Sequence, residues 1–588
     1  MQQNFNPLER YRAIEFERDW NRPINAPINT DQHVGFAQIG IQKNDKLKLL
    51  YGFNFFEEGA FYKGLKHSVQ SLYNTKTNSI SYNASYLTSN YNSLLSNFYR
   101  HKTAFSQSVW KLKLNYLDEF EQNQFKKNTS DTLLPRSYQF WEWEGNITNK
   151  DTSGNLFKLF YRERRDKQAY GSILKDSTLA QNIGFSANVN SIRNHPFSIV
   201  FTYRELQLKN ANPLYLKPDN TLLSRVEYSP RLIKGFITST IFYETGYGLE
   251  NKKEYYYLLV AAGQGTHAWK DYNGNGTQEV DEFEIAQFSD QALYIKVYTP
   301  TSQYVKVLRD QFSMSLNLRP VVFLKDSSRK ALKFISRFAT QSVYRIDKKS
   351  NDNGNLFSFN PSEINLNDPL LTAINYSLRQ SVFFNQSAAV FGTDYTYQNT
   401  LSKQLLTNGT EIRGNTTHEW RWRWNVTRAW SFNSANVFGI KQTVSEFLTN
   451  RNYKIESYDF EQKVNYQPNT AFRISVIYKH NKKQNSIEGG TQNAELNDFG
   501  LEFKYNQLEK GSITGKINLI NISYNDTENT AIAYEMLNAL KVGYNYTWGL
   551  SYQRNLSNNL QISINYDGRK SPNNQIINIG GAQIRAFF

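Results

Sequence analysis

The carboxy-terminal part of the chain alternates strictly between two kinds of side chain. From Leu540 to Tyr552 every second residue is apolar or aromatic, and the residues between them are polar or glycine. After a polar turn the same alternation returns between Leu560 and Tyr566. A period of two is typical of a β-strand with one apolar and one polar face. These runs are longer than the roughly five or six residues of a soluble strand, and they match the roughly 9 to 11 residues that a tilted strand needs to cross a bilayer.

Strands that cross a membrane place a condition on the whole sheet. Inside a bilayer every backbone N–H and C=O group must be bonded within the protein, so the sheet has to close on itself. We therefore predict an all-β fold, a transmembrane antiparallel β-barrel. Runs and turns from residue 34 onward give about 26 strands, within a range of about 22 to 28. We expect the last strand to pair with the first, with Phe588 and Ala586 facing lipid and Arg585 facing the lumen.

Alternating runs recur throughout the chain. The clearest, given by their apolar members, are Leu47, Leu49, Tyr51, Phe53 and Phe55; Trp110, Leu112, Leu114 and Tyr116; Phe312, Met314, Leu316 and Leu318; and Trp420, Trp422, Trp424 and Val426. In the last run Arg421 and Arg423 stand between the tryptophans. An arginine at the middle of the lipid face costs about 2 to 4 kcal/mol, so the tryptophans are expected to face lipid and the arginines the lumen.

The composition agrees with a barrel better than with a soluble protein or a helical membrane protein. Hydrophobic residues make up 39% of the 588 residues, and the mean hydropathy is −0.63. No apolar run approaches the roughly 18 residues of a transmembrane helix. Aromatic residues reach 15%, and barrels use such rings as girdles at both membrane interfaces. The alternative is a soluble β-solenoid or a multi-domain sandwich, whose cores rarely repeat alternating Trp and Tyr on one face.

The pattern divides the chain into two parts. Residues 1–33 lack period-two order and are interpreted as a periplasmic lead-in or a short plug segment, and residues 34–588 as the barrel. Two long polar connections, 264–303 and 347–371, follow odd-numbered strands and are expected to be extracellular loops. No apolar core segment of a signal peptide lies between Met1 and Pro23, so we expect the chain to begin at a mature terminus or at a fragment boundary. Cysteine is absent, which excludes disulfides, thiolate metal sites and a lipid-anchored amino-terminal cysteine.

One loop carries a sharp motif for metal binding. Residues 271–282 fit the pattern D-x-[DN]-x-[DN]-G-x5-E and resemble an EF-hand calcium loop. The resemblance implies a structural Ca²⁺ ion with oxygen ligands from Asp271, Asn273, Asn275, the Thr277 carbonyl, Glu279 through water and both oxygens of Glu282. The loop departs from the family at Gln278, where an aliphatic residue is usual, and no amphipathic helix precedes it. The alternative is a turn rich in Asn and Gly.

Positive charge is in excess. The chain has 68 Lys and Arg against 52 Asp and Glu, a net charge of +16. Cations on the predicted polar faces are Lys111, Lys113, Arg421, Arg423, Lys541 and Arg585. They fit either a basic lumen that favours anions such as phosphate, acidic glycans or lipopolysaccharide head groups, or a balance against lumenal carboxylates and anionic lipid at the rims; the second is slightly favoured. Nucleic-acid binding is not expected, because no such motif accompanies the charge.

The end of the chain and its overall character resemble known bacterial proteins. A terminal Phe588 with alternate apolar positions behind it is similar to the carboxy-terminal signal of Gram-negative outer-membrane barrels, although Ala586 stands where an aromatic residue is common. The size, the abundance of Asn, Tyr and Phe, the absence of Cys and the 271–282 loop resemble the large outer-membrane barrels of Bacteroidota. The resemblance implies a location in the cell outer membrane, in contact with lipid and lipopolysaccharide. It also implies partner outer-membrane proteins or lipoproteins, and recognition of the last strand by the assembly machinery.

Three functions remain open from the sequence. The first is a transport or translocation conduit, alone or as the barrel of a larger outer-membrane complex. The second is a non-conducting scaffold barrel that binds surface lipoproteins. The third, an outer-membrane barrel enzyme, is least favoured: the seven histidines are scattered, without an H-E-x-x-H pair, a G-x-S-x-G elbow or a phosphate loop. We therefore expect no enzymatic activity.

Overall fold

A computed structural model describes residues 18–22, 30–44, 46–150, 154–209, 219–325, 328–351, 364–406, 409–446, 448–507, 510–557 and 559–586. The chain divides into two compact units, Met1–Tyr228 and Ser229–Phe588. Each unit is an antiparallel β-sheet and is described by itself.

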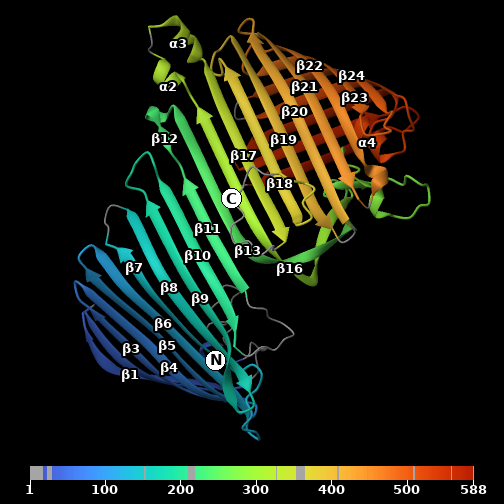
Figure 1. Ribbon diagram of the computed structural model, residues 1–588. Helices are drawn as coiled ribbons and strands as arrows, with labels where there is room; N and C mark the ends of the chain where they lie inside the picture. The colour runs from blue at the N-terminus through green and yellow to red at the C-terminus, as the bar shows by residue number, and fades with distance from the viewer. Residues whose placement is uncertain are drawn as a thin grey trace. The chain divides into compact units, whose positions relative to one another are not determined.

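The first unit is an eleven-stranded meander within the described residues (Figure 1). Its strands are β1 Gln32–Lys43, β2 Leu47–Glu58, β3 Tyr62–Asn74, β4 Asn78–Tyr91, β5 Leu94–Val109, β6 Leu112–Lys127, β7 Tyr138–Asn149, β8 Asn155–Tyr170, β9 Ile173–Val189, β10 Phe197–Leu208 and β11 Asp219–Tyr228. Every strand pairs antiparallel with the next one in the chain. Along each strand successive side chains point to opposite faces, so side chains two residues apart share a face.

The second unit continues the same architecture with longer connections. Its strands are β12 Arg231–Leu232, β13 Ile237–Leu259, β14 His267–Trp269, β15 Phe283–Ile285, β16 Tyr294–Leu318, β17 Phe338–Asn351, β18 Leu371–Phe384, β19 Phe391–Leu406, β20 Gly409–Asn425, β21 Trp430–Ser445, β22 Tyr453–Tyr466, β23 Phe472–Asn485, β24 Asn493–Gln507, β25 Gly511–Tyr524, β26 Gly543–Ser557, β27 Leu560–Lys570 and β28 Ile577–Ala586. Between them lie η2 Ile233–Gly235, η3 Val280–Glu282, α2 Val321–Leu324, α3 Lys330–Ile335, η4 Thr449–Arg451 and α4 Ala531–Met536. β13 pairs with β16, and from β16 to β28 each strand pairs antiparallel with the next.

The predicted fold class is confirmed: the chain is all-β, with long antiparallel strands of the kind that build outer-membrane barrels. The described residues form 28 strands, at the upper end of the predicted range, and three of these have only two or three residues. None of the helices in the described part is long and apolar enough to span a membrane. Pairing of the last strand with the first stays a prediction.

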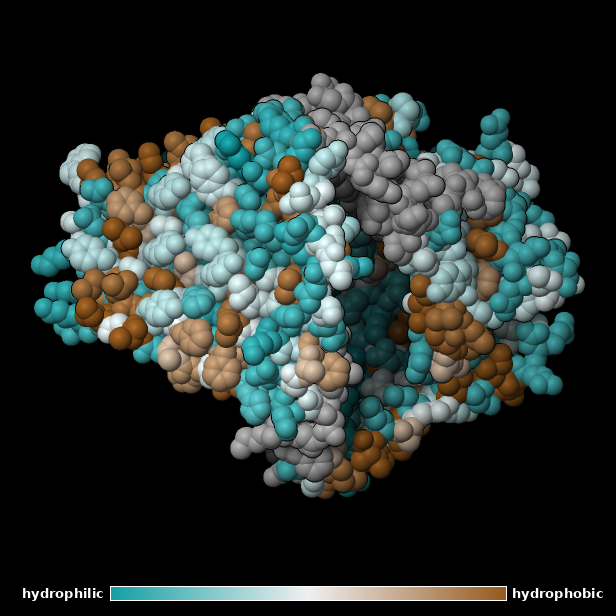
Figure 2. Space-filling view, turned by 90° about the horizontal axis from the view of Figure 1, so that it is seen from below, coloured by the Kyte–Doolittle hydropathy of each residue, from teal (hydrophilic) through white to brown (hydrophobic). Residues whose placement is uncertain are grey.

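Alternation gives each strand one apolar and one polar face. On β20 the side chains of Trp420, Trp422 and Trp424 are 50%, 37% and 50% exposed. Arg421 lies on the other face, where its guanidinium group contacts the Asp394 carboxylate at 2.9 Å. Hydrophobic side chains also gather in patches on the surface seen in Figure 2. The sheet therefore presents apolar rings to its surroundings on one face and ion pairs on the other, as predicted for this strand.

Two details of the predicted strands are wrong. The last alternating run does not begin at Leu540: this side chain is 7% exposed and packs with Met536 and Leu537 in a core cluster behind α4. β26 starts only at Gly543, whose φ of +98° turns the chain into the strand. Similarly, Trp110 is a turn residue between β5 and β6 with a φ of +51°. In both places a local turn interrupts an apolar spacing that looks continuous in the sequence.

The described piece of the predicted lead-in, residues 18–22, packs on the polar face of the first unit. Trp20 is 6% exposed and clusters with apolar side chains of β2 to β5. Asp19 contacts both Lys66 and Arg100; burial opposes its ionisation, but these two cations lower the pKa of its carboxyl below the ordinary value. Residues 1–17 and 23–29 of the predicted segment lie outside the described residues. β1 begins at Gln32, within two residues of the predicted start of the barrel.

Candidate functional site

The connection between β13 and β16, residues 260–293, is here called the strap. It contains β14, η3 and β15, and it is tied to residues that follow it far along the chain. These ties are Arg451 Nη2 to Glu284 Oε2 at 2.8 Å, Asn450 to Asp281 at 3.1 Å, Tyr534 Oη to the Ile285 carbonyl at 3.3 Å, Asn529 to the Asp271 carbonyl at 3.2 Å and Arg569 Nη2 to Asp290 Oδ2 at 2.5 Å. The strap is thus fixed to η4, β27 and the α4 region of the second unit. Residues 294–303 of the predicted loop belong to β16 instead. Of the second predicted loop, residues 352–363 lie outside the described residues.

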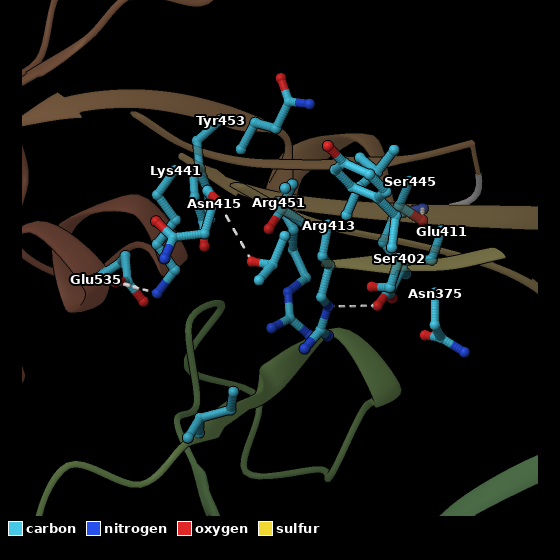
Figure 3. A pocket seen from close by; sticks show the side chains of 18 of the residues that line it. Asn375, Ser402, Glu411, Arg413, Asn415, Lys441, Ser445, Arg451, Tyr453 and Glu535 are labelled. Carbon is cyan, nitrogen blue, oxygen red and sulfur yellow. Dashed lines mark hydrogen bonds and ion pairs between the residues drawn. The ribbon is translucent and has the colours of Figure 1, made fainter. Parts of the chain in front are cut away.

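A cavity of about 560 Å³ lies beneath the strap on the polar face of the second unit. The strap lines it with His267, Phe283, Glu284 and Ile285, η4 with Arg451, and α4 with Ala531 and Glu535. The remaining walls are side chains of β17 to β22, several of which are shown in Figure 3. Its volume falls within the roughly 300 to 1,000 Å³ typical of small-molecule sites. We therefore treat this cavity as the candidate functional site.

Strand register explains why distant residues meet in the cavity. Direct antiparallel partners form two rows across β17 to β21: Arg345, Ser377, Thr400, Asn415 and Lys441; and Asp347, Asn375, Ser402, Arg413 and Thr443. Partners in neighbouring strands project to the same face, so each row presents polar groups side by side. The rows place cations among hydroxyl and amide groups.

Most cations of the cavity have carboxylate partners. Arg413 Nε contacts Glu411 Oε1 at 2.6 Å, and Lys441 Nζ contacts Glu535 Oε1 at 2.5 Å (Figure 3). The latter pair ties β21 to α4, just as Arg451 and Glu284 tie η4 to the strap. In the described part of the chain, Arg345 has no recorded hydrogen bond or ion pair. The cavity thus keeps one unpaired guanidinium group and three paired cations.

Burial and charge change the acidity of two strap residues. Burial, together with the nearby cations Lys296 and Arg413, lowers the pKa of His267 to about 4. The imidazole is therefore neutral at neutral pH. Burial raises the pKa of Glu284 to about 6, against the opposite effect of Arg451. Glu284 is thus ionised at neutral pH and close to titration in mildly acidic solution.

The six residues of the predicted calcium loop all lie at the tip of the strap. Asn273 and Asn275 each donate a side-chain hydrogen bond to Glu279, at 2.8 and 3.3 Å. Asp271 accepts the backbone N–H groups of Gly274 and Gly276. Thr277 donates its backbone N–H to Asn275 Oδ1 at 2.6 Å.

Glu282 differs from the other loop residues because it is 1% exposed. Its carboxylate accepts Trp269 Nε1–H at 2.7 Å and the Tyr272 N–H at 3.1 Å. The side chains of Asn273 and Asn275 therefore contact Glu279 through their amide N–H groups, and their amide oxygens accept backbone N–H groups of the loop. The carboxylate of Glu282 is held by the body of the strap. Across the described residues, no group of three or more His, Cys, Asp or Glu side chains is close enough to hold a metal.

Among the described residues, two of the six cations predicted on polar faces pair with carboxylates. Arg421 pairs with Asp394, and Lys541 lies 3.5 Å from Glu528. Arg423 donates to the Ala388 carbonyl, and Lys111 lies over the Trp110 ring. Arg421 and Lys541 thus agree with the interpretation that these cations balance carboxylates, whereas the contacts of Arg423 and Lys111 balance no charge.

The sequence prediction missed the cavity itself. Glu284 and Arg451 are 167 positions apart, and the other charged walls come from four further elements. No short motif connects them. The one signal in the sequence was the alternation of apolar and polar residues, which places Arg345, Arg413 and Lys441 on the polar faces of their strands. Register then decides which of them meet.

Comparisons with known proteins found neither a matching family model nor a matching curated protein. Solved structures similar to the chain include the ferric-catecholate import receptor Fiu from E. coli K12 (10% identity, TM-score 0.27, covering 92% of this chain and 77% of that one). Others are the copper transporter OprC (9%, 0.33, 89% and 85%) and the siderophore receptor PiuA from Acinetobacter baumannii (11%, 0.30, 92% and 77%). What those proteins import or bind is a property of those proteins.

Proposed function

We propose that the chain is an outer-membrane β-barrel protein whose polar face serves a transport or translocation pathway. The observation that carries this is the exposed apolar face shared by successive strands. Phe499 on β24 and Ile517 on β25 are 58% and 60% exposed, as are comparable residues on their neighbours. Contiguous apolar patches of this kind mark contact with a membrane or another protein. Their regular alternation with polar residues over strands of membrane-spanning length favours lipid.

The cavity on the opposite face supports transport over a purely structural role. A polar cavity lined by charged, hydroxyl and amide groups provides a binding site for a solute. The strap covers this site, so passage requires the strap to move. The alternative is a non-conducting scaffold that binds surface lipoproteins. It is favoured by the many ties that fix the strap, above all the double contact between Arg569 and Asp290.

Conductance separates these two functions. The full chain is purified from outer membranes, where we expect to find it, and reconstituted in planar bilayers. Arg569→Ala removes one anchor of the strap and is expected to raise conductance over the wild type. Arg421→Ala is the matched control, because it breaks an ion pair on the polar face outside the cavity lining. If the wild type, Arg569→Ala and Arg421→Ala all show no conductance, the scaffold function is favoured.

We also propose a structural Ca²⁺ ion at the strap tip. The support is the set of side chains in the motif: Asn273, Asn275 and Glu279 contact one another and carry oxygen atoms of the hard type that calcium prefers, and Asp271 adds a carboxylate at the start of the loop. The ion would be held by these residues with the Thr277 carbonyl and Glu282, and would supply positive charge that keeps the loop ordered.

A further inference from the structure

The cations that face the cavity are spread along its length. Arg345 on β17 and Lys441 on β21 end one row of register partners, with Ser377, Thr400 and Asn415 between them. Four strand spacings of about 4.8 Å separate the two ends, a backbone distance of about 19 Å. In Figure 3 the side chains of Arg413 and Arg451 both extend toward the strap. The cavity thus offers positive charge at several separated points, with hydroxyl and amide groups between them.

These cations keep hydrogen-bond donors for a ligand. A guanidinium group has five N–H donors in a planar fork. Arg413 contacts Glu411 through Nε, and Arg451 contacts Glu284 through Nη2, so each has further N–H groups. Arg345, among the described residues, has all of its donors unassigned. Arginine is well suited to carboxylate and phosphate groups, because its fork matches two oxygens at once.

Several cations lie near the strap. His267 lies in the cavity wall, and the cations that disfavour its protonation are Lys296, Arg413 and Arg451. The four lining carboxylates balance the four lining cations in number, but each carboxylate is held by a cation: Glu284, Glu411 and Glu535 as given above, and Asp347 by Arg309 at 2.6 Å. The groups left for a ligand are therefore mainly donors.

We propose that this cavity binds an elongated anion that carries two or more carboxylate or phosphate groups. One anionic group contacts Arg345 near β17, and another lies near Arg413 and Arg451 under the strap. Ser377, Thr400 and Asn415 hydrogen-bond the part between them. The proposal deepens the transport function proposed above by naming the chemistry of the cargo, and it rests on that function only for its biological meaning.

Equilibrium binding to the full chain in detergent tests the proposal. A short linear polyphosphate and an oligoglutamate peptide, each long enough to reach from β17 to η4, serve as polyphosphate and polycarboxylate probes, and sucrose as a neutral probe, in isothermal titration calorimetry. We expect at least one of the two anions to bind, sucrose not to bind, and affinity to fall as salt rises. Arg345→Gln and Arg413→Gln should each weaken binding about tenfold or more, because each removes a charged hydrogen bond. Polyphosphate binding without oligoglutamate binding would identify phosphate as the recognised group, and the reverse would identify carboxylate.

Two further variants make the result decisive. Arg345→Lys keeps the charge and should recover part of the affinity lost in Arg345→Gln. Arg421→Gln, whose ion pair lies outside the lining, should bind like the wild type. All variants are first required to show the folded, heat-modifiable band on a gel. Binding of sucrose alone, binding of no probe, or equal losses in Arg413→Gln and Arg421→Gln would overturn the proposal. Binding does not require passage across the membrane. A protein that binds the anion but shows no conductance would therefore contradict the transport function and support the anion site.

Discussion

At the residue scale, the ion pair between Glu284 and Arg451 controls how the strap is held. Both side chains are nearly buried, at 13% and 15% exposure. Taking either one away leaves the other charge buried without its partner, which costs about 3 to 5 kcal/mol in typical proteins. Substituting either partner is therefore more costly than in an exposed pair, which contributes about 0 to 1 kcal/mol. The intact pair itself stabilises the strap only weakly, because both charges lose hydration when they are buried.

The titration of Glu284 predicts that strap docking depends on pH. Burial raises its pKa to about 6 from an ordinary value of 4.5. The docked strap therefore binds more protons than a released one between these values. Docking is strongest below pH 4.5 and weakens as pH rises through about 6, by about 2 kcal/mol in total. The chain has no cysteine, so the variant Val280→Cys can be labelled with a fluorescent dye at this one position. The anisotropy of the dye reports how mobile the strap is, and it should fall as pH rises through about 6.

In the Glu284→Gln variant we expect the dye anisotropy to lose its change between about pH 4.5 and 6. Asp281→Asn, a neighbouring change that removes a carboxylate bonded to Asn450, should leave this change in anisotropy in place. The same change in anisotropy in Glu284→Gln would mean that another group titrates.

At the element scale, strand β20 tests the orientation of the sheet. Its tryptophans alternate with Arg421 and Arg423, and the structure places Arg421 with Asp394 on the polar face. Quenchers attached to lipid chains should therefore reach Trp420, Trp422 and Trp424. We expect the triple Trp→Phe variant to lose a large part of the quenchable fluorescence. Trp269→Phe, which removes a strap tryptophan bonded to Glu282, should lose little. The opposite ranking would place the arginines toward lipid.

The strap tip is the second element with a direct test. If Ca²⁺ orders the loop, chelation should increase protease cleavage within the strap, residues 260–293, and leave β13 and β16 uncut. Glu279→Gln should be cleaved more readily than the wild type at saturating calcium, because Glu279 holds Asn273 and Asn275. Asp281→Asn serves as the control, since this position is not a ligand in the motif. Equal cleavage of the wild type with and without chelator would show that the motif is only a turn.

At the scale of the whole molecule, local pattern predicted the strands and could not predict the cavity. The alternation around Trp422 is a property of neighbouring residues, so the sequence alone places it correctly. The burial of Leu540 depends on α4, and the pairing of Glu284 with Arg451 depends on how the strap folds back. Neither contact produces a periodic pattern in the sequence. Candidate ligands in 271–282 were found because they are contiguous. Residues such as Arg345 and Lys441 line the same cavity only because of the register of the four strand pairs from β17 to β21.

Adjacent residues on β25 test whether the apolar face of the molecule lies in a membrane. Ile517 is 60% exposed on that face, whereas Asn518 lies on the polar face and donates to Asp498 at 2.9 Å. Ile517→Arg places a charge toward lipid and should destabilise the protein by about 2 to 4 kcal/mol if the site lies near the bilayer middle. Asn518→Arg adds the same charge beside a carboxylate and should be tolerated. Folding into vesicles is followed by the fraction of protein that migrates as a compact band before heating. A deficit confined to Ile517→Arg is expected, because only that face meets a solvent unable to hydrate the guanidinium group. Equal losses in both variants would mean that the strand does not separate lipid from water.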